Sequence, residues 1–217
     1  MLAFSSLLGN VEGQNIYRIW YDKPASYWEE ALPVGNGRIA AMVFGDPQLE
    51  QIQLNEETVS AGSPYQNYNE EAKTALPEMR RLIFEGKYEE AQNMAATKIL
   101  SQVGNEMPYQ TVGRLNIRYQ DHKKVNNYYR DLDISNAVAV TRYKVDGVEF
   151  TEETFASFTD QLVIRHIKAS KPGTINCELF FNTPMRDPKR SIYGKKGLRL
   201  EGITHGSRYF PGKVHYC

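Results

Sequence analysis

The sequence lacks the features that would place it in several large classes of protein. No run of apolar residues among its 217 positions is long enough to span a bilayer. Neither sign of charge dominates, because 26 Lys and Arg balance 26 Asp and Glu, so no nucleic-acid partner is expected. The chain has no internal repeat and no low-complexity linker. Its length suits one large β-domain or two small domains.

Cysteine and histidine are also scarce. There is no C-x-x-C pair, and the four histidines are scattered without the spacing of a metal site. Cys177 shares a strand face with Leu179 and Phe181, which predicts a buried and inert thiol. Whether it pairs with Cys217 cannot be decided from the sequence. Neither a metal nor a cofactor is expected.

The chain does carry many aromatic residues and many turn signals. Its 14 Tyr and 2 Trp contribute to an aromatic content of 12%, which is typical of β-rich proteins. Short runs with strand character are separated by turns such as Asp146-Gly147, a strong hairpin signal. This spacing favours an antiparallel β-sandwich over a parallel sheet. The expected strands are 16–21, 39–44, 49–54, 115–119, 128–132, 137–145, 148–155, 161–169, 174–182 and 197–203.

The middle of the chain changes its period. Around residues 69–100 the composition turns to Ala, Glu, Lys and Met, and apolar residues recur at helical spacing. Asn69 is expected to cap the first helix, Gly86 to separate two helices, and Pro77 to cause a kink or a restart. The sequence therefore predicts a helical hairpin inserted between strands. Its predicted apolar face consists of Ala72, Leu76, Met79, Ile83, Tyr88, Ala91, Ala95 and Ile99.

One motif imitates a dinucleotide-binding fingerprint. Residues 35–40 satisfy G-x-G-x-x-G/A, a pattern that requires a preceding strand and a following helix to hold a pyrophosphate. Here Pro33 interrupts the approach, and residues 39–44 form a short apolar run that Gly45 closes. A glycine-permitted turn leading into a buried strand is the better interpretation.

The two ends of the chain carry weaker signals. Residues 1–14 contain a short apolar block and resemble the back half of a secretory signal, although no basic residue precedes it. Residues 15–217 are expected to form a single N-terminal β-sandwich domain. Residues 212–217 have the character of a strand cut off in its middle, which would leave backbone groups unpaired. The domain is therefore predicted to be truncated at its C-terminal end.

Several blocks in order resemble the N-terminal β-sandwich module of glycoside hydrolase family 95, the α-L-fucosidase-like enzymes. The opening blocks are a glycine turn feeding an apolar strand and a strand ending in an Asn-Glu-Glu corner. Further blocks resemble the family's helical insertion, a Y-Q-x-x-G-x-L strand start and a Y-R-x-L-D-L segment. The resemblance covers roughly residues 16–205, and the blocks lie at 31–46, 52–58, 78–91, 109–115, 128–134, 143–150 and 153–157.

This resemblance implies an inverting enzyme that releases α-linked L-fucose or, in some members, L-galactose. It places the catalytic residues on a separate (α/α)6 barrel that would follow this domain in the same polypeptide. None of those residues can be carried onto this chain, so the chain alone is expected to be inactive. The resemblance also implies a glycan substrate for the complete enzyme and, together with residues 1–14, a secreted or periplasmic location.

The acidic residues of the chain agree with that expectation. An inverting glycosidase needs two carboxyl groups about 6.5–9.5 Å apart across a pocket. Neighbouring acids in a strand point to opposite faces, and in a helix they diverge, so adjacent pairs cannot face one substrate. We expect them to be solvated residues at element ends. The pairs are Glu29-Glu30, Glu56-Glu57, Glu70-Glu71 and Glu152-Glu153.

Four polar residues flank the two opening blocks and are the candidates for contacts with substrate or a neighbouring domain. They are Asn36, Arg38, Asn55 and Glu56. The same side chains could instead satisfy backbone groups of their own turns, which is the commoner role of Asn in such positions.

A second interpretation of the whole chain is a stand-alone carbohydrate-binding β-sandwich that stacks sugars on aromatic side chains. It rests on analogy of fold. Tyr128 and Tyr129 are adjacent on a predicted strand, so only one of them can face a given surface. The candidate platforms are Trp20, Trp28, Tyr109, Tyr128 and Tyr129. A purely structural domain without any ligand is the third possibility.

Overall fold

The computed structural model describes residues 17–60, 68–101, 109–206 and 212–216, so the predicted leader at 1–14 lies outside the described residues. The chain divides into two compact units. The first consists of Met1–Glu57 and Arg114–Asn182, and the second of Thr58–Gly113 and Thr183–Cys217. In the described part of the chain, no helix is both long and apolar enough to cross a membrane.

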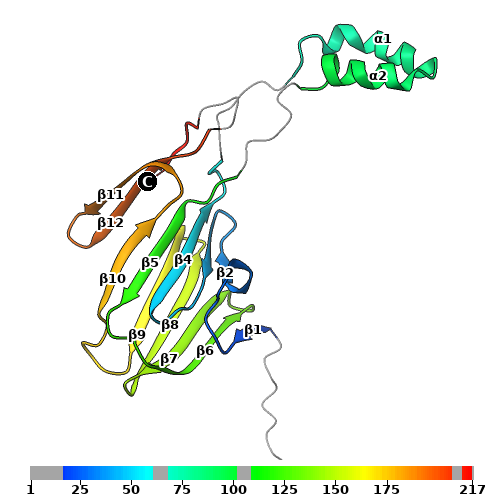
Figure 1. Cartoon of the computed structure of the whole chain (residues 1–217). Helices are drawn as coiled ribbons and strands as arrows, with labels where there is room; N and C mark the ends of the chain where they lie inside the picture. Colours follow the sequence, from blue (N-terminus) through cyan, green and yellow to red (C-terminus); the bar gives the residue numbers. More distant parts are fainter. Residues whose placement is uncertain (1–16, 61–67, 102–108, 207–211, 217) are drawn as a thin grey trace, which may run out of the picture. The chain divides into compact units, whose positions relative to one another are not determined.

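The first unit is a sandwich of two five-stranded sheets (Figure 1). One sheet has the order β1-β6-β7-β8-β9, with every neighbouring pair antiparallel. Its strands are β1 (Arg18–Tyr21), β6 (Val125–Asp133), β7 (Val138–Val145), β8 (Val148–Ser157) and β9 (Leu162–Ala169).

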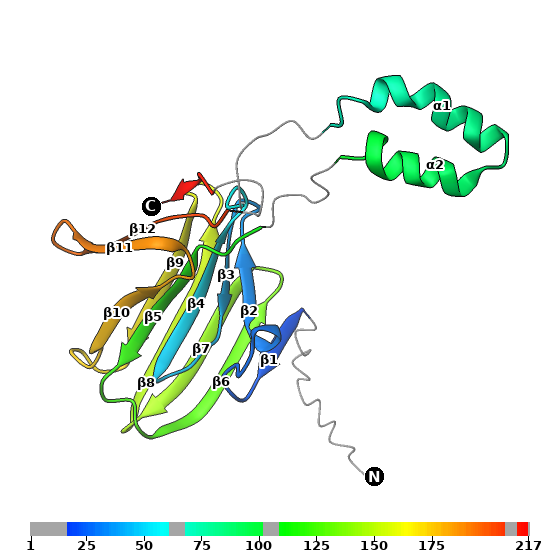
Figure 2. The ribbon, with the colours of Figure 1, turned by 45° about the horizontal axis from the view of Figure 1, so that its top comes forward.

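The other sheet has the order β10-β5-β4-β3-β2, and Figure 2 shows it facing the first. Its strands are β2 (Leu32–Gly35), β3 (Ile39–Val43), β4 (Leu49–Glu56), β5 (Gly113–Tyr119) and β10 (Cys177–Asn182). A short 3-10 helix, η1 (Trp28–Glu30), lies between β1 and β2 in the chain. The predicted mainly-β antiparallel sandwich is therefore confirmed.

The core of this unit forms where alternate residues of both sheets point inward. Leu32, Val43 and Ile52 come from the second sheet, and Leu132 and Ala139 come from the first; all five are buried in one cluster. A smaller cluster contains Tyr143, Val145 and Phe150. Strand alternation thus produces a shared apolar layer, and any polar side chain at an inward position must find its partners inside that layer.

The second unit contains the helical hairpin and a small sheet of its own. The hairpin consists of α1 (Ala72–Phe84), α2 (Tyr88–Met94) and a π-helical turn, η2 (Ala95–Ile99). The sheet has the order β11-β12-β13, with strands β11 (Arg186–Tyr193), β12 (Gly197–Ile203) and β13 (His215–Tyr216). The predicted hairpin around residues 69–100 is therefore confirmed.

The predicted apolar face of the hairpin is partly wrong. Ala75, Leu82 and Ala91 are its buried residues. Ile83 and Tyr88, which belong to the predicted face, are 42% and 69% exposed. Ala91 confirms the predicted face in α2, whereas in α1 the buried residues Ala75 and Leu82 each lie one position before a predicted residue, Leu76 and Ile83.

Asn69 does not occupy the expected cap position of α1, and the restart that was one alternative at Pro77 does not occur. The side-chain oxygen of Asn69 accepts a hydrogen bond from the backbone N–H of Glu71, and its amide donates to the carbonyl of Thr97. Asn69 thus forms a turn ahead of α1 and ties it to η2. Pro77 lies inside α1, which continues to Phe84 without a restart.

Two strands were not predicted, and two predicted features differ. The sequence did not predict β2 or β11. His215 and Tyr216 pair with Ile203 and Gly202 of β12, so the expectation that this terminal segment would be unpaired is wrong for these two residues.

Cys177 is partly buried and free, whereas Leu179 on the same face is 47% exposed. The burial predicted for this face is only partial because β10 is an edge strand. Cys217 lies outside the described residues.

The dinucleotide-like motif forms the turn of a hairpin. It joins β2 to β3, which pair antiparallel with Gly35 opposite Ala40. Gly37 has a φ of 92°, a backbone conformation that favours glycine. Because a strand and not a helix follows, this turn lacks the helix N-terminus that a pyrophosphate would need, and the expected glycine turn is confirmed.

Candidate functional site

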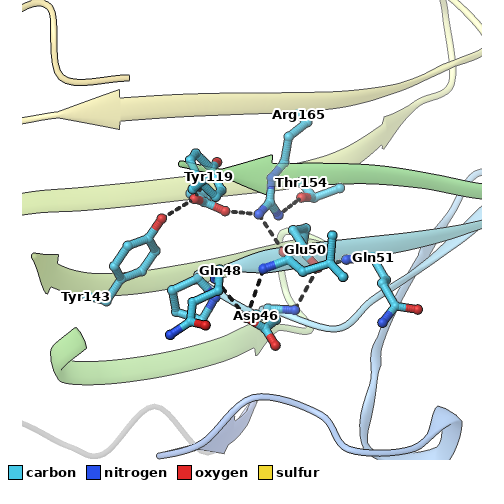
Figure 3. A network of polar contacts seen from close by, with 12 residues as sticks. Asp46, Gln48, Glu50, Gln51, Tyr119, Tyr143, Thr154 and Arg165 are labelled. Atoms are coloured by element: carbon cyan, nitrogen blue, oxygen red, sulfur yellow. Dashed lines mark hydrogen bonds and ion pairs between the residues drawn. The ribbon is translucent and has the colours of Figure 1, made fainter. Parts of the chain in front are cut away.

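A cluster of charged and hydroxyl side chains is buried between the two sheets of the sandwich (Figure 3). Glu50 on β4 and Glu152 on β8 are 0% and 1% exposed. Arg165 on β9 lies between them, with its side chain 8% exposed. Both sheets contribute, so the cluster joins the two layers where apolar contacts would otherwise be expected.

Arg165 holds the cluster together. Its Nη2 donates to Glu50 Oε2 at 2.6 Å and also contacts Glu152 Oε2. Its Nη1 donates to the Thr154 hydroxyl at 2.6 Å. One guanidinium therefore serves two buried carboxylates, an arrangement in which removing the cation leaves both acids without their opposite charge.

The remaining carboxylate oxygens of the two acids are also occupied. Glu152 Oε1 accepts hydrogen bonds from the hydroxyls of Tyr119 at 2.7 Å and Tyr143 at 2.6 Å. Glu50 Oε1 accepts from the backbone N–H of Gly45 at 2.8 Å and of Gln51 at 3.0 Å. This satisfaction explains how two acids can lie inside an apolar layer.

Burial perturbs the titration of several groups in and beside the cluster. It raises the pKa of Glu50 to about 7, with Glu152 adding to the rise and Arg165 opposing it. It also raises the pKa of Tyr119 and of Tyr143, both of which then donate to Glu152 as neutral phenols. The attraction of Arg165 outweighs the repulsion of Glu152, so the raised pKa of Glu50 comes from its burial.

The raised pKa of Glu50 predicts a specific pH dependence of stability. Between the ordinary value of 4.5 and about 7, the folded chain binds this proton more tightly than the unfolded chain does. Stability from this group is therefore present at low pH and decreases as the pH rises through that window. We expect urea unfolding to show that the free energy of unfolding of wild type falls between pH 5 and pH 8 relative to that of Glu50→Gln. The variant has no carboxyl group at this position to titrate.

The comparison with Glu50→Gln also cancels the contribution of His122, which changes stability with pH in the opposite direction. Burial lowers the pKa of His122, so that residue adds stability as the pH rises, and it is present in both proteins. Equal pH dependence in the two proteins would show that Glu50 does not bind an extra proton in the folded state.

The buried cluster supports the loop between β3 and β4. Gly45, at the start of this loop, donates its N–H to Glu50, and its carbonyl accepts the Tyr128 hydroxyl at 2.6 Å. The carbonyl of Pro47 lies 2.9 Å from Nδ1 of His122, which is stacked on Tyr119 with ring centroids 4.3 Å apart. The loop is thus bonded on its inner side to residues that belong to the cluster or touch it.

The outer side of this loop forms one wall of an open cleft of about 400 Å³, which we call the loop cleft. It is lined by Asp22, Lys23, Asp46, Pro47, Gln48 and Tyr128, with Pro24 and Val125 completing the apolar part. Three segments contribute: the chain after β1, the β3–β4 loop and the start of β6. All of them belong to the first unit.

The predicted site residue Asn36 is buried in the β2–β3 turn. Its Oδ1 accepts hydrogen bonds from the backbone N–H groups of Arg38 at 3.1 Å and Ile39 at 2.9 Å. Its Nδ2 donates to the carbonyl of Ser157 at 2.8 Å. Asn36 therefore closes its own turn and links the second sheet to β8 of the first.

The structure brings three of the four predicted residues together. Arg38 Nε donates to Glu56 Oε1 at 3.0 Å across the β3–β4 end, next to the turn that Asn36 closes. Asn55 precedes Glu56 and therefore points to the other face of β4. Its Oδ1 is buried and has no hydrogen-bond partner among the described residues. A contact of these residues with substrate or another domain stays a prediction.

Replacing Asn36 by alanine should lower the free energy of unfolding by about 1–3 kcal/mol. The change leaves two backbone N–H groups and the Ser157 carbonyl without their partner. Urea unfolding measures the effect. Asn126→Ala is the matched control, because Asn126 is exposed on β6 and no side-chain hydrogen bond engages it within the described residues. Similar losses for both variants would contradict the role assigned to Asn36.

The expectation that paired acids are solvated at element ends is wrong for Glu152. It lies in the middle of β8 and is buried, while its neighbour Glu153 faces the opposite side of the strand. Sequence reasoning also missed Glu50 and Arg165. The signal that could have found them is the two-residue spacing of a strand, which puts alternate residues on one face. Glu50 is two residues from Ile52, and Arg165 is two residues from apolar neighbours on either side, so both were marked as facing inward.

Taken together, the fold defines a mainly β domain, an antiparallel sandwich with a helical hairpin inserted between β4 and β5. A family model described as "Glycosyl hydrolase family 65, N-terminal domain" matches residues 19–215. The chain belongs to this family of N-terminal domains. This match and the following relatives confirm the predicted N-terminal domain of an α-fucosidase-like glycoside hydrolase.

Three curated proteins are similar to the chain over most of its length. It is 37% identical to "Alpha-L-fucosidase 2" of Arabidopsis thaliana over 181 residues, which cover 81% of the chain and 21% of that protein. It is 26% identical to "Probable alpha-fucosidase A" of Aspergillus niger over 162 residues, covering 70% and 20%.

The third relative is "Probable alpha-fucosidase A" of Aspergillus oryzae, 25% identical over 211 residues that cover 91% of the chain and 28% of that protein. The chain therefore spans between 20% and 28% of the length of these curated relatives.

Proposed function

We propose that this chain is the non-catalytic N-terminal β-sandwich of an α-L-fucosidase-like inverting glycoside hydrolase. In the complete enzyme it supports and orients a downstream catalytic (α/α)6 barrel, which acts on the glycan substrate. Export to a secreted or periplasmic location is part of the same proposal, and it rests on the leader-like segment at residues 1–14 together with the family resemblance.

The placement of the buried acids carries the proposal. An inverting reaction needs two carboxyl groups about 6.5–9.5 Å apart with room for water and sugar between them. Glu50 and Glu152 instead converge on one atom, Nη2 of Arg165, inside the layer between the sheets. A substrate could reach them only if the sandwich opened. These two acids are therefore assigned to holding the sheets together and not to hydrolysis.

The second support is the length of the relatives. Two proteins named as α-fucosidases and one named as α-L-fucosidase 2 each contain a segment similar to this chain, and most of each protein lies outside that segment. The residues that cleave the glycosidic bond are accordingly proposed to lie in the remaining part of such a polypeptide.

A domain exchange tests the proposal. The segment of the Arabidopsis relative that matches this chain is replaced by this chain, and hydrolysis of an aryl α-L-fucoside is measured. We expect activity to be retained in the chimera. We expect it to be lost when the chimera carries Arg165→Met, which disrupts the sandwich, and kept when it carries Arg118→Met, which alters an exposed pair.

Two outcomes of the exchange would overturn the proposal. One is a chimera that is folded by circular dichroism yet inactive. The other is a chimera whose activity is indifferent to Arg165→Met, because a domain that supports the barrel cannot be dispensable for it.

A further inference from the structure

The loop cleft has the architecture of a small-molecule site, and we propose that it binds a neutral saccharide. Its volume of about 400 Å³ lies in the range of ligand pockets, about 300–1,000 Å³. Half of its eight lining residues carry charged or carboxamide side chains, which suits a ligand rich in hydrogen-bonding groups. The inference rests on the proposed function for its ligand class, since the relatives are named as α-fucosidases.

The β3–β4 wall of the cleft is fixed before any ligand arrives. Oδ1 of Asp46 accepts the backbone N–H groups of Gln48 at 2.8 Å and Leu49 at 3.1 Å, closing the turn. The carbonyl of Gln48 accepts the N–H of Tyr119 at 3.0 Å. With Gly45 bonded to Glu50 and to Tyr128, the loop has little freedom to lose on binding, which favours affinity for a small ligand.

The cleft offers polar groups that the fold does not use. No hydrogen bond within the described residues engages the side chains of Asp22 or Gln48, and both line the cleft. Lys23 adds an ammonium group, which pairs with Glu30 at 3.3 Å on a side chain that is 62% exposed. A carboxylate, a carboxamide and an ammonium provide both acceptors and donors. A polyhydroxyl ligand, whose groups donate and accept, matches this mixture.

The same lining argues against an anion or a metal ion as the ligand. Asp22 and Asp46 outnumber Lys23, whose charge Glu30 partly balances, so an anion would meet a negative surface. A metal ion needs several oxygen, nitrogen or sulfur ligands at one point. The described residues contain no group of three or more His, Cys, Asp or Glu side chains that could hold one. With anions and metal ions disfavoured, the mixture of donors and acceptors in the lining favours a neutral sugar.

Binding is tested on the full chain by two-dimensional amide NMR, titrated with methyl α-L-fucoside and, separately, methyl β-D-glucoside. We expect saturable shifts at Asp22, Lys23, Gln48 and Tyr128 with at least one of the two sugars. Asp22→Ala/Gln48→Ala should bind about tenfold more weakly, as expected for the loss of two hydrogen bonds. Gln92→Ala, an exposed change on α2 in the second unit, should bind like wild type.

Two results would overturn the proposal. One is the absence of saturable shifts with both sugars. The other is a set of shifts centred away from the cleft that the double variant leaves unchanged, for example at the nearly parallel rings of the exposed Trp20 and the half-buried Tyr129. Either result leaves the proposed function standing, because that is judged by the activity of the chimera. Conversely, an inactive chimera would not decide whether the cleft binds sugar, because binding is measured by the amide shifts of the chain itself.

Discussion

Replacing Arg165 by methionine should lower the free energy of unfolding by about 3–5 kcal/mol at pH 8. Methionine keeps much of the side-chain volume but removes the one cation that serves Glu50 and Glu152. Both acids would remain buried between the sheets without their opposite charge, which is the costly way to break a buried ion pair. Urea unfolding followed by tyrosine and tryptophan fluorescence measures the loss.

The effect of Arg165→Met should depend on pH. At pH 5 Glu50, whose pKa burial raises to about 7, is protonated and neutral, so the loss should be smaller than at pH 8. Arg118→Met is the matched control, because its pair with Glu178 is half exposed and should contribute less than about 1 kcal/mol. A loss at Arg165 no larger than that at Arg118 would contradict the assigned role of the cluster.

Replacing Gly45 by alanine should lower the free energy of unfolding by about 2–4 kcal/mol. Gly45 has a φ of 74°, which is unfavourable for residues with a side chain. A Cβ atom there would meet the Tyr128 hydroxyl at 2.8 Å and Cδ of Arg130 at 2.9 Å. Arg130 is fully buried and bonded to two carbonyl groups, so it cannot move aside freely.

Gly147→Ala separates the two contributions to that loss. Gly147 has a similar φ of 81°, yet an added Cβ atom would meet nothing within 4 Å. Its replacement should therefore cost about 1 kcal/mol, from the backbone conformation alone. Thermal unfolding of both variants gives the difference. Equal losses would show that the packing around Gly45 is looser than its distances indicate. The wall of the loop cleft would then also be less rigid than proposed.

Much of the fold was predictable because the strands of the sandwich alternate clearly. The β7–β8 hairpin follows directly from two alternating runs around Asp146-Gly147, and the structure pairs them with Val145 opposite Val148. The change to helical period at residue 69 likewise predicted the hairpin. Local signals sufficed in both cases because neighbouring segments in the chain are also neighbours in space.

The two strands that the sequence analysis missed share a physical reason. Both β2 and β11 are edge strands, and each contains a proline, Pro33 and Pro188. Proline cannot donate a ladder hydrogen bond, so it argues against a strand in general but is tolerated at an edge. In β11 the register shifts between Arg186 and Lys189, beside Pro188. Whether a strand lies at an edge is a property of the whole sheet and is not visible locally.

The candidate site was less predictable than the fold. The buried cluster joins Glu50 to Glu152 and Arg165, more than 100 residues further along the chain, and only the packing of the two sheets brings them together. Their positions on the inward faces of strands marked these charged residues as unusual, but those positions could not identify their partners. In contrast, the turn role of Asn36 followed from local chemistry and is observed in its hydrogen bonds.

The most direct test of the account is an assay of the purified chain alone with 4-nitrophenyl α-L-fucopyranoside. The account predicts no release of nitrophenol above the buffer rate, because the acids buried in the sandwich are engaged by Arg165 and two tyrosines and no substrate reaches them. Release that rises in proportion to the amount of chain would contradict it, and would place hydrolytic residues within these 217 positions.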